Sequence, residues 1–180
     1  QPTPLPTALT KFLDGTPNAA NAGGRRYVKI TNSLPRGILS APASATLTSP
    51  VGTTIRYTTN NSFPSRTNGI IYTQPIPITT TTVLKTFAYS ANSESKTESF
   101  TYIFPVKGPE LTFPNLVTDA QYENGMKLLP IVSLSTTLDT LDNRTEKRAS
   151  FEYISKFGTN TSIGVNCGVR GYGNDSYIFS

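Results

Sequence analysis

The chain has 180 residues, a net charge of +5 and 36% hydrophobic residues. Its length accommodates one medium domain or two small ones, each with a buried core. The only tight basic pairs are Arg25-Arg26 and Lys147-Arg148, the second beside Glu146, so Lys and Arg do not form the clustered basic face of a nucleic-acid site and no nucleic-acid partner is expected. No apolar run reaches the roughly 20 residues of a membrane-spanning helix, and no membrane span is expected.

Residue usage narrows the chemistry further. The single cysteine, Cys167, excludes a disulfide within the chain. The absence of histidine excludes a Cys–His catalytic pair and a His-ligated metal, and we expect no cofactor. Abundant Thr, Tyr, Phe, Val and Ile, interrupted by Pro and Gly, predict a mainly β fold of short strands.

In chain order, residues 1–36 are predicted to form an extended linker or docking segment. This stretch is rich in Pro, Thr, Ala and Asn, a composition that buries little apolar area. Within it, residues 8–13 are a candidate short strand, and residues 26–30 alternate polar and apolar side chains as a strand does.

Residues 37–104 have the pattern of a β-sandwich, with short strands close together and turn signals between them. Asn60–Pro64 and Asn68-Gly69 are the turn signals, and alternate prolines predict that residues 74–78 form an edge strand. The predicted strands are residues 45–48, 55–58, 70–72, 74–78, 83–89 and 100–104.

The segment Ile55-Arg56-Tyr57-Thr58-Thr59-Asn60-Asn61-Ser62-Phe63-Pro64 resembles the "I-R-Y-T-T-D-G-S-x-P" signature of the chitobiase/β-hexosaminidase C-terminal-like, fibronectin-III-associated domain. The resemblance continues in order through residues 68–89. It implies an immunoglobulin-like β-sandwich that serves as a spacer or accessory module on secreted enzymes and surface proteins. Asn60-Asn61 replaces the usual Asp-Gly, which removes an acid from the turn.

Residues 105–180 are predicted to form a smaller β-rich (α+β) region. Residues 107–127 are interpreted as a connector, and the apolar run 128–135 as a buried strand. Residues 136–142 can form one helical turn. Further strands are predicted at residues 149–154 and 163–170.

This second region resembles the beginning of the spore-coat protein CotH family, whose members have a kinase-like fold. The resemblance rests on residues 129–136, on residues 146–153 and on Gly168-Val169-Arg170-Gly171-Tyr172-Gly173. The family's catalytic acids would lie further downstream, so the resemblance implies only a partial CotH-like region.

Two chemical interpretations compete with purely structural ones. The glycines at positions 168, 171 and 173 resemble a phosphate-binding loop, but neither a lysine nor a helix signal follows them, which favours a plain turn. The carboxylates Asp139, Asp142, Glu146 and Glu152 are candidates for glycosidase chemistry. Helix capping and a position on the polar face of a strand account for them more simply, so no catalytic or metal residue is assigned.

The candidate binding residues are aromatic. In the 83–89 strand, Leu84, Thr86 and Ala88 fit the inward face, so Phe87 and Tyr89 are predicted to point outward as an interface or ligand surface. The candidate N-glycosylation sites are Asn60, Asn143, Asn160 and Asn174.

We therefore expect a non-catalytic, secreted or cell-surface structural or adhesive protein, with protein neighbours or self-association as its partners, in a filament for example. The alternatives are the N-terminal fragment of a CotH-like secreted kinase, and a carbohydrate-binding accessory module whose partner is a cell-surface polysaccharide.

Overall fold

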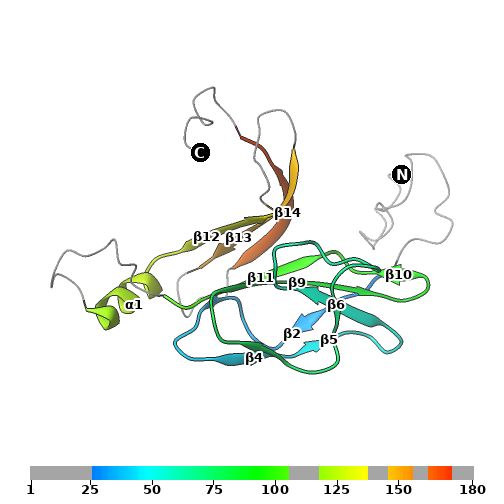
Figure 1. Ribbon diagram of the computed structural model, residues 1–180, viewed down its shortest axis with the longest axis horizontal. Helices are drawn as coiled ribbons and strands as arrows, with labels where there is room; N and C mark the ends of the chain where they lie inside the picture. Colours follow the sequence, from blue (N-terminus) through cyan, green and yellow to red (C-terminus); the bar gives the residue numbers. More distant parts are fainter. Residues whose placement is uncertain (1–25, 106–117, 138–145, 156–161, 172–180) are drawn as a thin grey trace, which may run out of the picture.

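A computed structural model describes residues 26–105, 118–137, 146–155 and 162–171. The described chain is mainly β, with a β-sandwich and a separate three-stranded sheet, as the sequence predicted. In Figure 1 the three-stranded sheet lies on one side of the β9–β11 layer, and β2, β4 and β5 lie on the other side. The fold is therefore built in three layers.

The central layer is a seven-stranded sheet in which β9 pairs with both β6 and β11. Its main strand order is β1-β10-β9-β11-β3, and β7 extends it beyond β6. The strands are β1 (Arg26–Tyr27), β3 (Gly37–Ile38), β6 (Thr54–Thr58), β7 (Ile70–Ile71), β9 (Thr82–Tyr89), β10 (Ser93–Glu94) and β11 (Glu98–Ile103).

Two short ladders complete the sandwich. In one, β2 (Thr31–Asn32) pairs with β5 (Leu47–Thr48); in the other, β4 (Ala43–Ala45) pairs with β8 (Ile76–Ile78). Ile76 and Ile78 are buried while Pro77 is exposed, which matches the predicted edge strand with proline on its outer side. The core between the layers contains Val28, Ile30, Ala45, Leu47, Ile55, Ile76, Ile78, Leu84, Ala88, Phe100 and Tyr102.

The sandwich begins earlier in the chain than predicted. Residues 26–36 were assigned to the linker, but β1 pairs with β10, β2 pairs with β5, and Val28 and Ile30 are buried in the core. The sequence indicated a strand at residues 26–30, but so short a segment carries too little pattern to show that it pairs with β10 and packs into the sandwich. The candidate strand at residues 8–13 lies outside the described residues.

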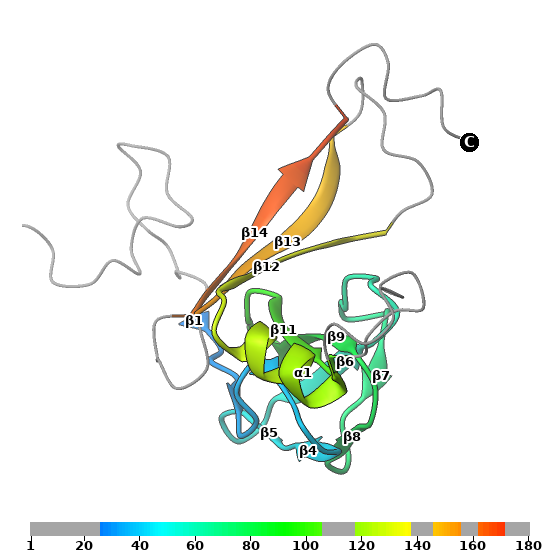
Figure 2. The ribbon, with the colours of Figure 1, turned by 90° about the vertical axis from the view of Figure 1, so that its left-hand side faces the viewer.

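The third layer is an antiparallel sheet in the order β12-β13-β14, formed by β12 (Ile131–Thr136), β13 (Lys147–Ile154) and β14 (Ile163–Val169). Its strands alternate, so one face carries mostly polar side chains and the other mostly apolar ones. Figure 2 shows this sheet rising from the β11 side of the sandwich. Its polar face is the one that contacts the sandwich, through β13 and β14 against β11.

The prediction that residues 128–135 form a buried strand is therefore corrected. Leu128 and Leu129 precede the strand and are exposed, and Val132 and Leu134 point to solvent from β12. The apolar run is real, but Val132 and Leu134 lie on the outer face of an open sheet and Leu128 and Leu129 lie before it. The predicted helical turn at residues 136–142 begins on the last residue of β12, and its residues 138–142 lie outside the described residues.

The predicted connector contains a helix, α1 (Asp119–Lys127). Thr118 forms a capping box with Gln121, each side chain bonding the other's backbone N–H. Ser40 of the sandwich contacts the helix by donating to Glu123 Oε1 over 2.6 Å and accepting from Lys127 Nζ over 2.9 Å. The Thr-x-x-Gln signal was present in the sequence, and a search for capping boxes would have found it.

Candidate functional site

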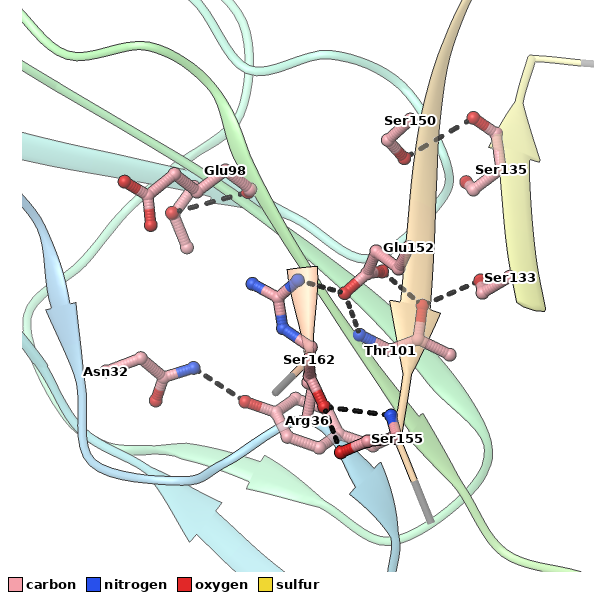
Figure 3. A network of polar contacts seen from close by, with 12 residues as sticks. Asn32, Arg36, Glu98, Thr101, Ser133, Ser135, Ser150, Glu152, Ser155 and Ser162 are labelled. Atoms are coloured by element: carbon pink, nitrogen blue, oxygen red, sulfur yellow. Dashed lines mark hydrogen bonds and ion pairs between the residues drawn. The ribbon is translucent and has the colours of Figure 1, made fainter. Parts of the chain in front are cut away.

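The contact between the sandwich and the three-stranded sheet, which we call the seam, is built around Glu152. This β13 side chain is only 1% exposed. Its Oε1 accepts from the backbone N–H of Thr101 on β11 over 3.2 Å, and its Oε2 accepts from the Thr101 hydroxyl (Figure 3). Ser133 on β12 bonds the same hydroxyl over 2.8 Å. A single β11 residue therefore ties two strands of the upper sheet to the sandwich.

Arg36, in the segment that leads into β3, supplies the opposite charge. Its Nη1 lies 3.2 Å from Glu152 Oε1 without the alignment of a hydrogen bond. Burial raises the pKa of Glu152, while the Thr101 hydrogen bonds and the Arg36 charge oppose that rise. The carboxylate of the upper sheet is thus buried against two hydrogen-bond donors and one cation of the sandwich, which is the arrangement that makes such a group structurally tolerable.

A cationic cluster adjoins Glu152. The Lys85 ammonium lies 3.9 Å and the Arg148 guanidinium carbon 4.0 Å from the ring centroid of Phe63, so one ring contacts two cations. Lys85 Nζ donates to the Asn61 carbonyl over 2.8 Å. Burial, followed by the charge of Arg148, lowers the pKa of Lys85 to about 8.

The turn at Asn60-Asn61 also contributes to the seam. Asn61 has a φ of 64°, the left-handed conformation that the sequence predicted this turn would tolerate. In this conformation its backbone carbonyl reaches Lys85, while its side-chain Oδ1 accepts from Ser135 of β12 over 3.0 Å. The segment that carries the family-like signature therefore helps to hold the upper sheet.

Beside the seam is a cleft of about 660 Å³ between the edge of β11 and the underside of β14. Its lining side chains combine cationic, acidic, hydroxyl and amide groups with apolar surface. The lining side chains that matter for its chemistry are Arg36, Lys96, Glu98, Ser99, Ser150 and Asn166. Burial raises the pKa of Glu98.

The predicted aromatic surface is partly corrected. Leu84, Thr86 and Ala88 are buried as expected, and Phe87 and Tyr89 lie on the opposite face of β9. Phe87 is nevertheless only 8% exposed, because that face is covered. Tyr89 stacks on Phe87 with 5.9 Å between ring centroids, and the Arg66 guanidinium lies over the Tyr89 ring at 4.9 Å.

The remaining predicted site residues fall in different places. Asn60 is exposed, and its side-chain oxygen accepts from Ser62 in the turn. Glu146 is exposed and Glu152 is buried in the seam, so these two carboxylates have different surroundings. Asn143, Asn160, Asn174, Asp139, Asp142 and Gly173 lie outside the described residues.

Two further observations concern metals and membranes. Within the described ranges, no three His, Cys, Asp or Glu side chains gather where they could hold a metal ion. In the same ranges there is no helix with the length and apolar character needed to cross a bilayer. Cys167 is a free thiol on β14 and is partly exposed.

Comparison with known protein families gives a match in the sandwich. The family described as Fn3 associated matches residues 45–102, which run from the end of β4 to the penultimate residue of β11. This agrees with the fibronectin-III-associated resemblance found at Ile55–Pro64. No curated protein and no solved structure matches the chain. The CotH-like resemblance of residues 105–180 stays a prediction.

Proposed function

We propose that this chain is a non-catalytic, extracellular structural module in which the sandwich supports the three-stranded sheet as an assembly surface. The match over residues 45–102 supports an accessory role for the sandwich. The seam supports a fixed placement of the upper sheet, since Glu152, Arg36 and Thr101 connect the two layers through buried polar contacts.

The observation that carries this proposal is the outer face of the β12–β14 sheet. Across the three strands, Val132 lies beside Tyr153 and Tyr153 beside Ile163. In the next row, Leu134 lies beside Phe151 and Phe151 beside Val165, so all six side chains share one face. All of them except Phe151 are among the exposed large hydrophobics of the chain: Val132, Leu134, Tyr153, Ile163 and Val165. A contiguous apolar surface of this kind marks an interaction site.

The proposed occupant of this face is a second copy of the chain. These two rows and the adjoining Thr136–Ala149–Cys167 row contain no charged side chain, and Lys147 lies only in the row beyond them, so the exposed apolar part offers no complement to a charged partner. An identical apolar face is a matching surface, and two sheets pack face to face at about 10 Å as in a sandwich. A two-fold arrangement would bury both faces.

The test is the mass in solution, by light scattering and sedimentation over a range of concentrations. We expect association to twice the monomer mass of 19.5 kDa. Leu134→Asp puts a charge in the centre of the face at a residue that is 52% exposed, and we expect it to give a monomer. The matched control is Ile70→Asp on β7, which is 58% exposed but away from the face, and it should still associate.

A wild-type chain that stays monomeric at millimolar concentration would contradict the proposed self-association. Equal weakening of association by Leu134→Asp and Ile70→Asp would contradict it as well. The extracellular part of the proposal is supported by the exposed Asn60 sequon and by the composition. It is tested by locating the protein in fractions of the source cells, where recovery in the soluble cell interior would overturn it.

The carbohydrate-binding alternative is less well supported by the geometry. Phe87 is buried and the Tyr89 ring is covered by Arg66, so the predicted pair does not present a flat open platform. The CotH-like kinase alternative rests on the sequence resemblance alone. Neither has an observation in its favour as direct as the exposed sheet face.

A further inference from the structure

The outer edge of β11, which faces away from β9, is closed almost everywhere. Near its end, the Ile103 carbonyl accepts from Leu39 N–H over 2.8 Å. The Thr101 N–H donates to Glu152 Oε1 over 3.2 Å. Just before the strand begins, the Thr97 carbonyl accepts from Asn166 Nδ2 over 2.9 Å. Thr97, Thr101 and Ile103 therefore each direct a peptide N–H or C=O to this edge, and each of these groups has a hydrogen-bond partner.

Ser99 is the exception. Strand alternation puts its N–H and C=O on the same edge as those of Thr97 and Thr101, and no described group bonds them. Its side-chain oxygen is also buried without a hydrogen-bond partner, in a residue that is 6% exposed. Buried polar side chains are nearly always paired, so the unpaired Ser99 hydroxyl beside this stretch of strand edge points to a missing ligand.

These groups open into the 660 Å³ cleft beside the seam. Side chains close the edge at Thr97 and again at Thr101, four residues further along, which corresponds to about 13 Å of strand. β14 passes over the gap, where Gly164 lies so close to Arg36 that an added Cβ would clash with its Nη1. The opening therefore accepts a narrow, extended ligand and not a bulky one.

We propose that this cleft binds a short extended peptide segment of another polypeptide, whose main chain pairs with Ser99 as an added strand. An extended peptide presents a donor and an acceptor on one edge at every second residue, which is what Ser99 requires. Arg36 already faces the Glu152 carboxylate and Glu98 also lines the cleft, so the main chain of the segment, and not its side-chain charge, is what the site recognises. This site is on the opposite side of the β12–β14 sheet from the apolar face, so it is independent of the proposed self-association.

The probe is the capped peptide acetyl-Thr-Val-Asp-Val-amide, titrated into the ¹⁵N-labelled full chain while amide chemical shifts are recorded. We expect saturable shifts centred on the Ser99 amide. Ser99→Pro removes the N–H that faces the cleft without removing a bond to β9, and proline is tolerated at such edge positions. It should weaken binding by about tenfold or more, whereas Ser99→Ala, which keeps the N–H, should weaken it by only a few fold.

A second arm uses the unmodified protein, so it does not depend on whether Ser99→Pro folds. The same peptide N-methylated at its central amides cannot pair as a strand and should not bind. The proposal is overturned if no saturable shifts occur up to millimolar peptide, or if the N-methylated peptide binds equally well. It is also overturned if an N-acetylated chito-oligosaccharide causes the Ser99 shifts and the peptide does not. Leu134→Asp serves as the control that should bind the peptide normally, which separates this site from the assembly face.

Discussion

Lys85 shows how a single residue responds to the two layers that cover it. It lies on β9 between Thr86 and Leu84, on the face away from the core, yet its side chain is fully buried by the Asn60-Asn61 turn and the upper sheet. Its neighbours include the cation Arg148 and the carboxylate Glu152. Burial and Arg148 dominate, so the charged form of Lys85 is disfavoured in the folded protein.

This lowered pKa predicts how stability changes with pH. The pKa of Lys85 falls from its ordinary 10.5 to about 8 on folding, so between these values the unfolded chain binds more protons than the folded one. The free energy of unfolding should therefore rise with pH in this window. Above about pH 10 the raised pKa of Tyr102, about 12, acts in the opposite direction, because the folded state then holds the extra proton.

The measurement is chemical denaturation of the wild type and of Lys85→Met at several pH values. The difference between the two curves isolates the lysine, since Tyr102 contributes equally to both. We expect the free energy of unfolding of the wild type to rise relative to that of Lys85→Met as the pH rises from about 8. Parallel curves over this range would show that Lys85 titrates normally.

At the scale of elements, turn and cap signals explain why strands and helices begin and end where they do. Gly69, in the predicted Asn-Gly turn, has a φ of 101° and lies against the Tyr57 carbonyl, where an added Cβ would be 2.8 Å from the oxygen. Only glycine fits both constraints. In contrast, Gly125 in α1 has nothing within 4 Å of an added Cβ and no positive φ.

These two glycines give a matched pair of substitutions. Gly69→Ala should lower the free energy of unfolding by about 1–3 kcal/mol, because it adds backbone strain and a steric clash. Gly125→Ala should raise the stability of the helix by up to about 1 kcal/mol, because alanine has the higher helix propensity. Thermal and denaturant unfolding of both variants measure this, and destabilisation by Gly125→Ala would contradict the assigned helix.

At the scale of the whole molecule, the seam decides whether the two β regions unfold together. Its contacts join β11 to β12 and β13 through small polar residues, with Thr101 at the centre. The upper sheet has only three strands and exposes its apolar face, so it depends on the sandwich for stability. We therefore expect one cooperative transition in the wild type.

Thr101→Val tests this coupling with little change of shape. It removes the hydroxyl that bonds Glu152 and Ser133 and leaves the buried carboxylate short of a donor, at a cost of about 1–3 kcal/mol. Amide hydrogen exchange should speed up in β12–β14 before it does in β6 and β9. Thr79→Val, at an exposed position, is the control and should change neither property. Uniform faster exchange throughout both regions would argue against a local seam.

Sequence alone determined the mainly β class, the approximate positions of β6, β7, β8, β9 and β11, and the family-like turn at Asn60-Asn61. Those features depend on local alternation and turn chemistry, which neighbouring residues specify. Tertiary structure decided the rest. It covered Phe87, buried Glu152 against Thr101, drew residues 26–36 into the sandwich and left the apolar face of β12–β14 outside. A strand pattern shows that two faces differ, but only the packing of distant strands determines which face becomes buried.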